Sequence, residues 1–532
     1  MVKSPGRAGL GEPLPTDATT SATDTARPAR KSALHSVLSN WAGLAVNTVL
    51  SLALTPILVH GLGDANYGMW MLVASLLDSS WLLDFGMRAT VFRFVARYQG
   101  SGEREALDMT FSSGVAVVFA SAATILLLTV ASIFILPGLF FISAAARPLF
   151  MNLLLLSGAS VAAGFMGQFL GSYMCACRRF DLYNLGSTGF GILRALLIVV
   201  VLHLGMGVLV VAAATLLCSV LGLLANTWLV HIADPELAFS VRKIRRDHIG
   251  KLMSFSRYSF LATTGDQLRF FVDSIVIGRI LTLALITPFN IAGRIVTLYR
   301  MVMAALGSPF AGRMNELEGQ DAQQELRAYF LLSTRLCALA SFFIGLVLLL
   351  NGQVIIRLWI GESYAQRSFP LLAVLLVGHI FMLAQSPSGD LLLAKGQHRL
   401  RGWWTVGEGV ANLALSIYWG QKYGLFGIAL GTTVPMLAVQ FFVQPWYTFY
   451  KTGISVASYL RESFLRPVAA AVLFLAVWFA ARGLQHGTGL WSLALSMTWQ
   501  VLLAAGLSLM VGITATERRH FALSVRQLLS RV

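Results

Sequence analysis

The feature that most constrains this chain is a succession of apolar runs that fills it almost from end to end. Each run has about 20 residues, the length of helix that crosses the hydrocarbon layer of a membrane. Hydrophobic residues make up 56% of the 532 residues and charged residues only 12%. A spanning helix satisfies every backbone N–H and C=O group within itself, and no barrel-like alternation is visible. We therefore expect an all-α polytopic membrane protein.

The apolar runs predict fourteen transmembrane helices. They lie at 36–59, 67–88, 110–136, 150–174, 183–203, 207–231, 254–280, 284–308, 331–352, 369–392, 402–420, 425–449, 465–482 and 489–512. Most Lys and Arg residues fall in short loops on one side of this arrangement. Because positive loops stay in the cytoplasm, both termini are expected there.

The net charge of +16 does not indicate a nucleic-acid partner. Its Lys and Arg residues are spread over the loops between apolar runs, as membrane topology requires. No basic helix with interleaved aromatic residues remains once those loops are set aside. We therefore expect no nucleic acid among the partners.

The chain shows signs of an internal duplication. The segment Leu204–Val208 opens the sixth predicted span, and the similar segment Tyr423–Ile428 opens the twelfth. Repeated lobes around a site at mid-depth are typical of transporters. The expected units are a disordered cytoplasmic tail at 1–33, an N-terminal six-helix lobe at 34–231, a basic cytoplasmic linker at 232–253, a C-terminal six-helix lobe at 254–450, helices 13 and 14 at 451–514, and a cytoplasmic tail at 515–532.

Two neighbouring spans, 254–280 and 284–308, carry charges at membrane depth. Such a charge costs roughly 2.5–3.5 kcal/mol on insertion scales, so it marks a candidate functional site. Asp266, Arg269 and Asp273 share one helix face, where they either neutralise one another as a structural network or serve a ligand. Arg294 and Arg300 have no acid three or four residues away. These two arginines are expected to face a cavity that takes an anion.

Further polar residues complete the predicted site. Arg194 lies near mid-membrane without a local acid, and Asp78 and Glu408 are candidate counter-charges. Asp84 and Arg88 are four residues apart and are expected to pair as a clamp at the inner interface. The substrate-binding candidates are therefore Arg294, Arg300, Arg269 and Arg194, and the charge-balancing or ion-coupling candidates are Asp266, Asp273, Asp78 and Glu408.

Catalytic and cofactor chemistry finds little support in the sequence. No phosphate-binding Gly-x-x-x-x-Gly-Lys-[Ser/Thr] loop and no His-Glu-x-x-His motif is present. The four cysteines lack the spacing and partner ligands of a zinc site. We expect no enzyme activity, no cofactor and no metal.

Residues 56–97 form the most distinctive segment. It contains the turn Gly63-x-x-x-Tyr67-Gly68 and the span end Asp84-Phe85-Gly86. This segment resembles the polysaccharide-transporter branch of the multidrug/oligosaccharidyl-lipid/polysaccharide exporter superfamily, the Wzx-type flippases of O-antigen and exopolysaccharide units. Close motif agreement is confined to this segment, while span count and loop pattern agree over most of the chain. Gly61, Gly63 and Gly68 are expected to permit a tight outer turn.

The resemblance implies a flippase of the bacterial inner membrane. It would move undecaprenyl-pyrophosphate-linked oligosaccharide units for O-antigen, capsule or exopolysaccharide synthesis, by alternating access of two lobes around a cationic cavity. The implied partners are that substrate, membrane lipids and other polysaccharide-assembly membrane proteins.

Two alternative functions stay open. A cation-coupled multidrug exporter of the same superfamily tends to carry an acid in its first span, where this chain has only Asn40 and Asn47. A membrane-embedded polysaccharide polymerase or ligase needs a sizeable outer loop, and the expected outer loops are short.

Overall fold

The computed structural model describes residues 26–84, 87–246, 248–250, 253, 272–481, 489–514 and 517–519. Every regular element within these ranges is a helix. Eleven of the described helices are long and apolar enough to cross a membrane. The chain is thus an all-α multi-pass membrane protein. The number of fourteen spans stays a prediction, because most of the span expected at 254–280 lies outside the described residues.

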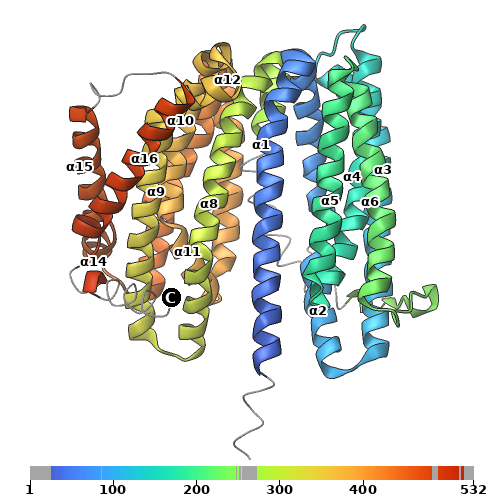
Figure 1. The fold of residues 1–532 in the computed structure, drawn as a ribbon, viewed down its shortest axis with the longest axis horizontal. Coiled ribbons are helices and arrows are strands. Elements are labelled where there is room, and N and C mark those ends of the chain that lie inside the picture. The colour runs from blue at the N-terminus through green and yellow to red at the C-terminus, as the bar shows by residue number, and fades with distance from the viewer. Residues whose placement is uncertain are drawn as a thin grey trace, which may run out of the picture.

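The N-terminal lobe occupies the right half of Figure 1, in blue to green. Its elements are α1 Ala26–Asp78, η1 Ser79–Asp84, α2 Met87–Ser101, α3 Arg104–Leu139, α4 Arg147–Ala176, α5 Phe180–His203 and α6 Val208–Ala233. Helix α4 packs between α3 and α6, and α5 packs against α1 and α6. These apolar helices form a bundle that runs along one common direction (Figure 1).

The C-terminal lobe occupies the left half, in yellow to orange (Figure 1). Residues 272–280 are helical, and the elements that follow are η3 Leu283–Leu285, α8 Ile286–Gly319, α9 Gln323–Trp359, α10 Glu362–Ala384, α11 Ser386–Ala394, α12 His398–Ala438, the π-helical segment η4 Val439–Val443 and α13 Gln444–Thr452. Helix α10 packs against α8, α9 and α12, so it forms the centre of this lobe.

The last described helices flank the C-terminal lobe, in red at its edge (Figure 1). They are α14 Val456–Tyr459, the π-helical η5 Leu460–Phe464, α15 Leu465–Ala481, α16 Leu490–Leu507 and the π-helical η7 Ser508–Gly512. Phe474 packs edge-on against Phe343 of α9, with ring centroids 5.4 Å apart. Asn351 of α9 donates to Gln500 of α16 at 2.8 Å. Helices α15 and α16 are therefore anchored to α9 by apolar and polar contacts.

Two long helical stretches are broken by a single glycine. Gly63 in α1 has φ 74° and Gly424 in α12 has φ 60°, values that favour glycine because it has no Cβ. Each break falls where a loop between two spans is expected. Gly61 and Gly68 were expected to permit the same turn, and this was wrong. Of these three glycines only Gly63 has a positive φ. An added Cβ on Gly61 would meet Leu202 at 3.2 Å, and one on Gly68 would lie 2.0 Å from the Leu283 carbonyl oxygen.

The span expected at 67–88 does not run through as one helix. It changes to the 3-10 helix η1 at Ser79, and α2 begins as a separate element at Met87. Asp84 and Arg88 therefore sit on different elements. Their side chains still meet, with Arg88 Nε 3.1 Å from Asp84 Oδ1.

The two lobes touch at the end of the bundle that carries Gly63, here called the Gly63 end. The Asp64 carboxylate of α1 accepts hydrogen bonds from Arg367 at 2.9 Å and from Tyr364, both on α10. The backbone oxygen of Asp64 accepts from Thr287 of α8 at 2.9 Å. Trp359 of α9 donates to the Leu52 carbonyl oxygen of α1 at 2.9 Å. These contacts tie the lobes together at the Gly63 end.

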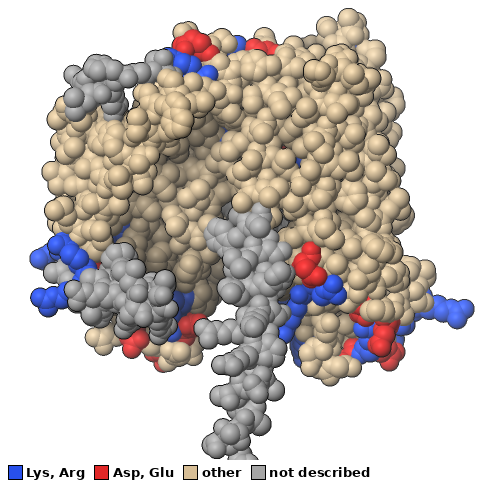
Figure 2. Space-filling view, viewed as in Figure 1, with Lys and Arg blue, Asp and Glu red and all other residues tan. Residues whose placement is uncertain are grey.

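Charged residues on the surface gather at the two ends of the bundle. Figure 2 shows Lys, Arg, Asp and Glu side chains at the top and bottom, with an uncharged band between them. Large exposed apolar side chains of the described residues include Phe119, Phe134, Trp228 and Trp491. An apolar band between charged rims is the surface that a bilayer requires.

The segment after α6 is fastened to the N-terminal lobe by ion pairs. Asp234 is 7% exposed and accepts two hydrogen bonds from Arg104 at 2.8 Å and one from Tyr173 at 2.6 Å. Lys243 donates to Asp108 at 2.6 Å. The linker expected at 232–253 is therefore held against α3 and α4 over its first part.

Replacement of Asp234 by alanine is expected to lower the free energy of unfolding by about 2 kcal/mol at neutral pH. Breaking a buried pair costs more in general, but the Arg104 side chain is 36% exposed, and solvent screens part of the loss. Asp181→Ala is the matched control, because Asp181 also binds an arginine but is 45% exposed. Thermal unfolding in detergent measures both variants, and equal losses would contradict the expectation.

The same contact predicts a pH dependence of stability. Burial raises the pKa of Asp234, but the hydrogen bonds from Arg104 and Tyr173 outweigh it and leave that pKa below its ordinary value. The native state therefore binds fewer protons at this carboxyl than the unfolded state. Its contribution is present above the unfolded pKa of about 4 and is lost as the pH falls through the lower folded pKa. Asp234→Ala should remove this acid-side loss.

A polar cavity between the two lobes

Helix α8 carries Arg294 on the face that is turned away from the core of its own lobe. Asn290, Arg294 and Thr297 are spaced by four and three residues, so they lie on one face. The opposite face of α8 is buried through Ile291, Ile295 and Tyr299, among others. Tyr299 also donates to the Ser341 carbonyl oxygen of α9 at 2.8 Å. Packing thus fixes the rotation of α8 and presents Arg294 toward the N-terminal lobe.

A cavity of about 330 Å³, here called the interlobe cavity, lies along this face. It is lined by Met71, Ser75, Asp78, Asp273, Ser274, Phe289, Asn290, Gly293, Arg294, Val296, Thr297, Arg300, Leu375, His379 and Thr432. The structure brings together four residues selected from the sequence, two arginines and two aspartates. Asp78 comes from α1 and the other three from the C-terminal lobe, so the cavity lies where the lobes meet.

Arg294 is the central residue of this region. Besides the interlobe cavity, it lines a cavity of about 190 Å³ with Arg194, Tyr67 and Thr215, and one of about 200 Å³ with Asn47 and Ser51. Its guanidinium interacts electrostatically with Asp78 and lies 3.4 Å from the Ser51 hydroxyl. Arg194 of the N-terminal lobe and Arg294 of the C-terminal lobe therefore line the same cavity of about 190 Å³.

Asp273, which lines the interlobe cavity, lies among several side chains that carry oxygen atoms. It is 6% exposed, and both carboxylate oxygens accept from the Thr432 hydroxyl, at 3.0 and 2.9 Å. The Thr432 hydroxyl is 3.4 Å from the Asn412 side-chain oxygen, to which Ser416 donates at 2.8 Å. A carboxylate with nearby hydroxyl and amide oxygens has the ligand chemistry that hard cations prefer. The described residues hold no cluster of three or more His, Cys, Asp or Glu side chains.

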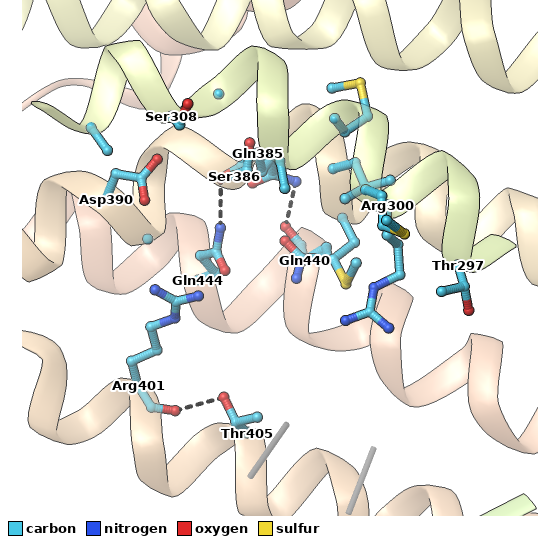
Figure 3. A pocket seen from close by; sticks show the side chains of 18 of the residues that line it. Thr297, Arg300, Ser308, Gln385, Ser386, Asp390, Arg401, Thr405, Gln440 and Gln444 are labelled. Carbon is cyan, nitrogen blue, oxygen red and sulfur yellow. Dashed lines mark hydrogen bonds between the residues drawn. The ribbon is translucent and has the colours of Figure 1, made fainter. Parts of the chain in front are cut away.

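A larger cavity of about 520 Å³, here called the C-lobe pocket, adjoins the interlobe cavity. Thr297 and Arg300 line both cavities. The C-lobe pocket also contains Arg401, Asp390 and several glutamines (Figure 3). Sequence reasoning missed these residues, because Arg401 follows a basic loop and was assigned to topology. The signal that could have found them is the Ser386-Pro387 step inside an apolar span, which predicts a helix break.

The remaining predicted residues lie elsewhere. Arg269 and Asp266 are outside the described residues. Glu408 is 3% exposed on α12 and does not line these cavities. Arg88 and Asp84 lie at the opposite end of the N-terminal lobe from the Gly63 end, where Arg88 also donates to Gln168. The cationic charge of the cavities is weighted toward the C-terminal lobe, with Arg194 as the N-terminal contribution.

Comparison with solved structures decides the fold class. The protein described as "Lipid II flippase MurJ, inward closed conformation" superposes with a TM-score of 0.66 and 16% identity, covering 93% of this chain and 100% of that one. An inward-facing multidrug resistance MATE family transporter of the MOP superfamily superposes with a TM-score of 0.65 and 15% identity, covering 77% of this chain and 96% of that one. The chain shares the fold of these two transporters.

Sequence comparison adds the branch of this superfamily. The family described as "Polysaccharide biosynthesis protein" matches residues 178–368. A Shigella flexneri protein named as an O-antigen transporter is 19% identical over 412 residues, which is 77% of this chain and 96% of the relative. Teichuronic acid biosynthesis protein TuaB of Bacillus subtilis is 24% identical over 276 residues, 51% of this chain and 54% of the relative. The resemblance to the polysaccharide-transporter branch is confirmed.

Proposed function

We propose that this protein is a flippase for oligosaccharide units linked to undecaprenyl pyrophosphate. The observation that carries the proposal is the set of three arginines, Arg194, Arg294 and Arg300, that face the cavities between two lobes of a membrane bundle. The similarity to a protein named as an O-antigen transporter supports the substrate class.

The chemistry of the substrate explains why such a cavity is needed. Moving a pyrophosphate through hydrocarbon without a partner is prohibitive, because an ion loses its hydration there. Guanidinium groups replace that hydration with paired charge and bidentate hydrogen bonds. Arg194 and Arg294 belong to different lobes, so a bound pyrophosphate contacts both lobes at once. The polyprenyl tail stays in the surrounding lipid throughout.

Transport then requires the cavity to open alternately at one end of the bundle and at the other. The lobes are joined at the Gly63 end by Asp64, Tyr364, Arg367 and Thr287. If the protein lies in a bacterial inner membrane with both termini on the cytoplasmic side, the Gly63 end faces away from the cytoplasm. The cavity then receives substrate from the cytoplasmic side. Rocking of the lobes breaks the Asp64 contacts and opens the Gly63 end. Asp78 balances Arg294 when the cavity is empty, and the oxygen set around Asp273 takes a coupling cation.

A leaflet assay in reconstituted vesicles tests the proposed function. A fluorescent oligosaccharide on undecaprenyl pyrophosphate is incorporated, and an impermeant quencher reports the fraction in the outer leaflet. Vesicles with the protein should expose nearly all of the lipid to the quencher over time, while protein-free vesicles expose only the outer half. Equal behaviour of the two vesicle types would contradict the proposal. Drug resistance in cells together with that result would indicate a drug exporter instead.

A further inference from the structure

The C-lobe pocket is built on two irregular pieces of backbone. Helix α10 ends at Ala384 and α11 starts at Ser386, so the span is interrupted at Gln385. On the facing helix, the π-helical segment η4 carries Gln440 and is followed by Gln444 at the start of α13. Irregular backbone at membrane depth is tolerated where it lines a cavity or is buried in protein, and π-helical turns are frequent at functional sites.

The glutamines of these two segments hold each other in place. Gln385 Nε2 donates to the Gln440 backbone oxygen at 2.9 Å, and Gln444 Nε2 donates to the Gln385 backbone oxygen at 3.1 Å. These bonds give hydrogen-bond donors to backbone carbonyl groups that have no partner within the irregular helices. They also join α10 and η4 into a rigid wall of the pocket (Figure 3).

Gln440 has an acceptor that this wall does not use. Its side chain is 3% exposed and lines the pocket, and its Oε1 atom has no hydrogen-bond partner among the described residues. A buried polar atom without a partner costs about 1–3 kcal/mol. A ligand that donates a hydrogen bond at this position would recover that cost.

The other residues that line the C-lobe pocket indicate the chemical class of its ligand. Trp404 contributes an aromatic surface, and Ser308 and Thr405 contribute hydroxyl groups. Arg300 and Arg401 stand on either side of the glutamines in Figure 3, and Asp390 interacts electrostatically with Arg401. A sugar ring has hydroxyl groups that donate and accept, and C–H faces that pack on an aromatic ring. Amide, hydroxyl, guanidinium and indole groups together match that chemistry.

We propose that the C-lobe pocket is a saccharide subsite that binds a sugar residue of the cargo, with Gln440 Oε1 accepting from a sugar hydroxyl group. The inference rests on the proposed function, in which Arg194, Arg294 and Arg300 together hold the pyrophosphate. Arg300 and Thr297 line both cavities. A sugar attached to a phosphate at Arg300 therefore reaches the C-lobe pocket without crossing a barrier.

A binding experiment with two probes separates the subsite from the phosphate site. The full-length protein in lipid nanodiscs is titrated with undecaprenyl pyrophosphate and with the lipid-linked oligosaccharide extracted from the source cells. Gln440→Leu removes the acceptor at similar volume and should weaken oligosaccharide binding about tenfold, the value of a hydrogen bond to a buried partner. It should leave binding of the sugar-free lipid unchanged. Gln421→Leu replaces an exposed glutamine on α12, the helix that leads into η4, and should change neither.

Two further variants complete the design. Arg401→Met should also weaken oligosaccharide binding and leave binding of the sugar-free lipid unchanged. Arg401 is exposed, so this variant should fold even if Gln440→Leu does not. Arg294→Ala should weaken both probes. Equal affinity of wild type and both pocket variants for the oligosaccharide would overturn the subsite while leaving the proposed function intact. Failure of the wild type to bind either lipid would overturn the proposed function and the subsite with it.

Discussion

Replacement of Arg294 by alanine is expected to lower export of the proposed lipid-linked oligosaccharide about 100-fold or more. A hydrogen bond to a charged group contributes about 1.5–3 kcal/mol, and the exposed guanidinium of Arg294 lines three of the cavities described here, where it can meet the proposed pyrophosphate. The change also leaves Asp78 without the guanidinium that faces it. Polysaccharide at the cell surface and protein abundance in the membrane are measured together in a deletion strain.

The control for this experiment lies on the same helix. Arg313 of α8 is exposed and pairs with Glu316 at 2.8 Å, away from the cavities. Arg313→Ala should leave export unchanged, because exposed ion pairs contribute little. Arg294→Lys should keep part of the activity, since lysine retains the charge but not the bidentate geometry. Full export by Arg294→Ala at normal abundance would rule out the role assigned to this residue.

Closure of the Gly63 end should fail when Gly68 is replaced by alanine. The added Cβ would lie 2.0 Å from the Leu283 carbonyl oxygen, which is backbone of the other lobe and cannot rotate away. The lobes must separate by more than an ångström, which weakens the contacts of Asp64 with Arg367 and Tyr364. Export should fall about tenfold, as expected for loss of the partly exposed hydrogen bonds of Asp64 in the closed state.

Labelling from outside the cell measures this opening directly. A cysteine introduced at Ser51, which lines a cavity beside Arg294, reacts with an impermeant maleimide only when the Gly63 end is open. Labelling should increase in the Gly68→Ala background. Gly164→Ala is the matched control, because that helical glycine has no neighbour within 4 Å and should be neutral or slightly stabilising. Unchanged labelling and export in Gly68→Ala would show that the ends close without this contact.

The fold class followed from length and composition because helix formation in lipid is a local requirement. Each apolar run must satisfy its own backbone, so the run itself identifies a span. The glycine breaks at Gly63 and Gly424 fall in the predicted loops for the same local reason. The end of the span at 67–88 was missed, because a switch to 3-10 geometry at Ser79 leaves the apolar pattern unchanged.

The candidate site was predicted where its signal lies within one helix. Arg294 and Arg300 have no acid within reach along α8, and that absence can be seen in the sequence. The glutamines of the C-lobe pocket gave no such signal, because a neutral amide in an apolar span also suits helix packing. Their proposed role in binding a sugar depends on the interruption at Gln385 and the π-helical turn at Gln440, which come together only when the chain folds.

By itself, the sequence determined that the chain is a multi-pass helical protein whose α8 span carries arginines with no acid three or four residues away. Only the tertiary structure decided that Arg294 lies near Asp78, that Arg194 lines a cavity together with Arg294, and that Arg300 lines two cavities. The reason is physical. A hydrophobic run reports the free energy of one segment in lipid, whereas the partner of a buried charge is set by how segments more than 200 positions apart pack against each other.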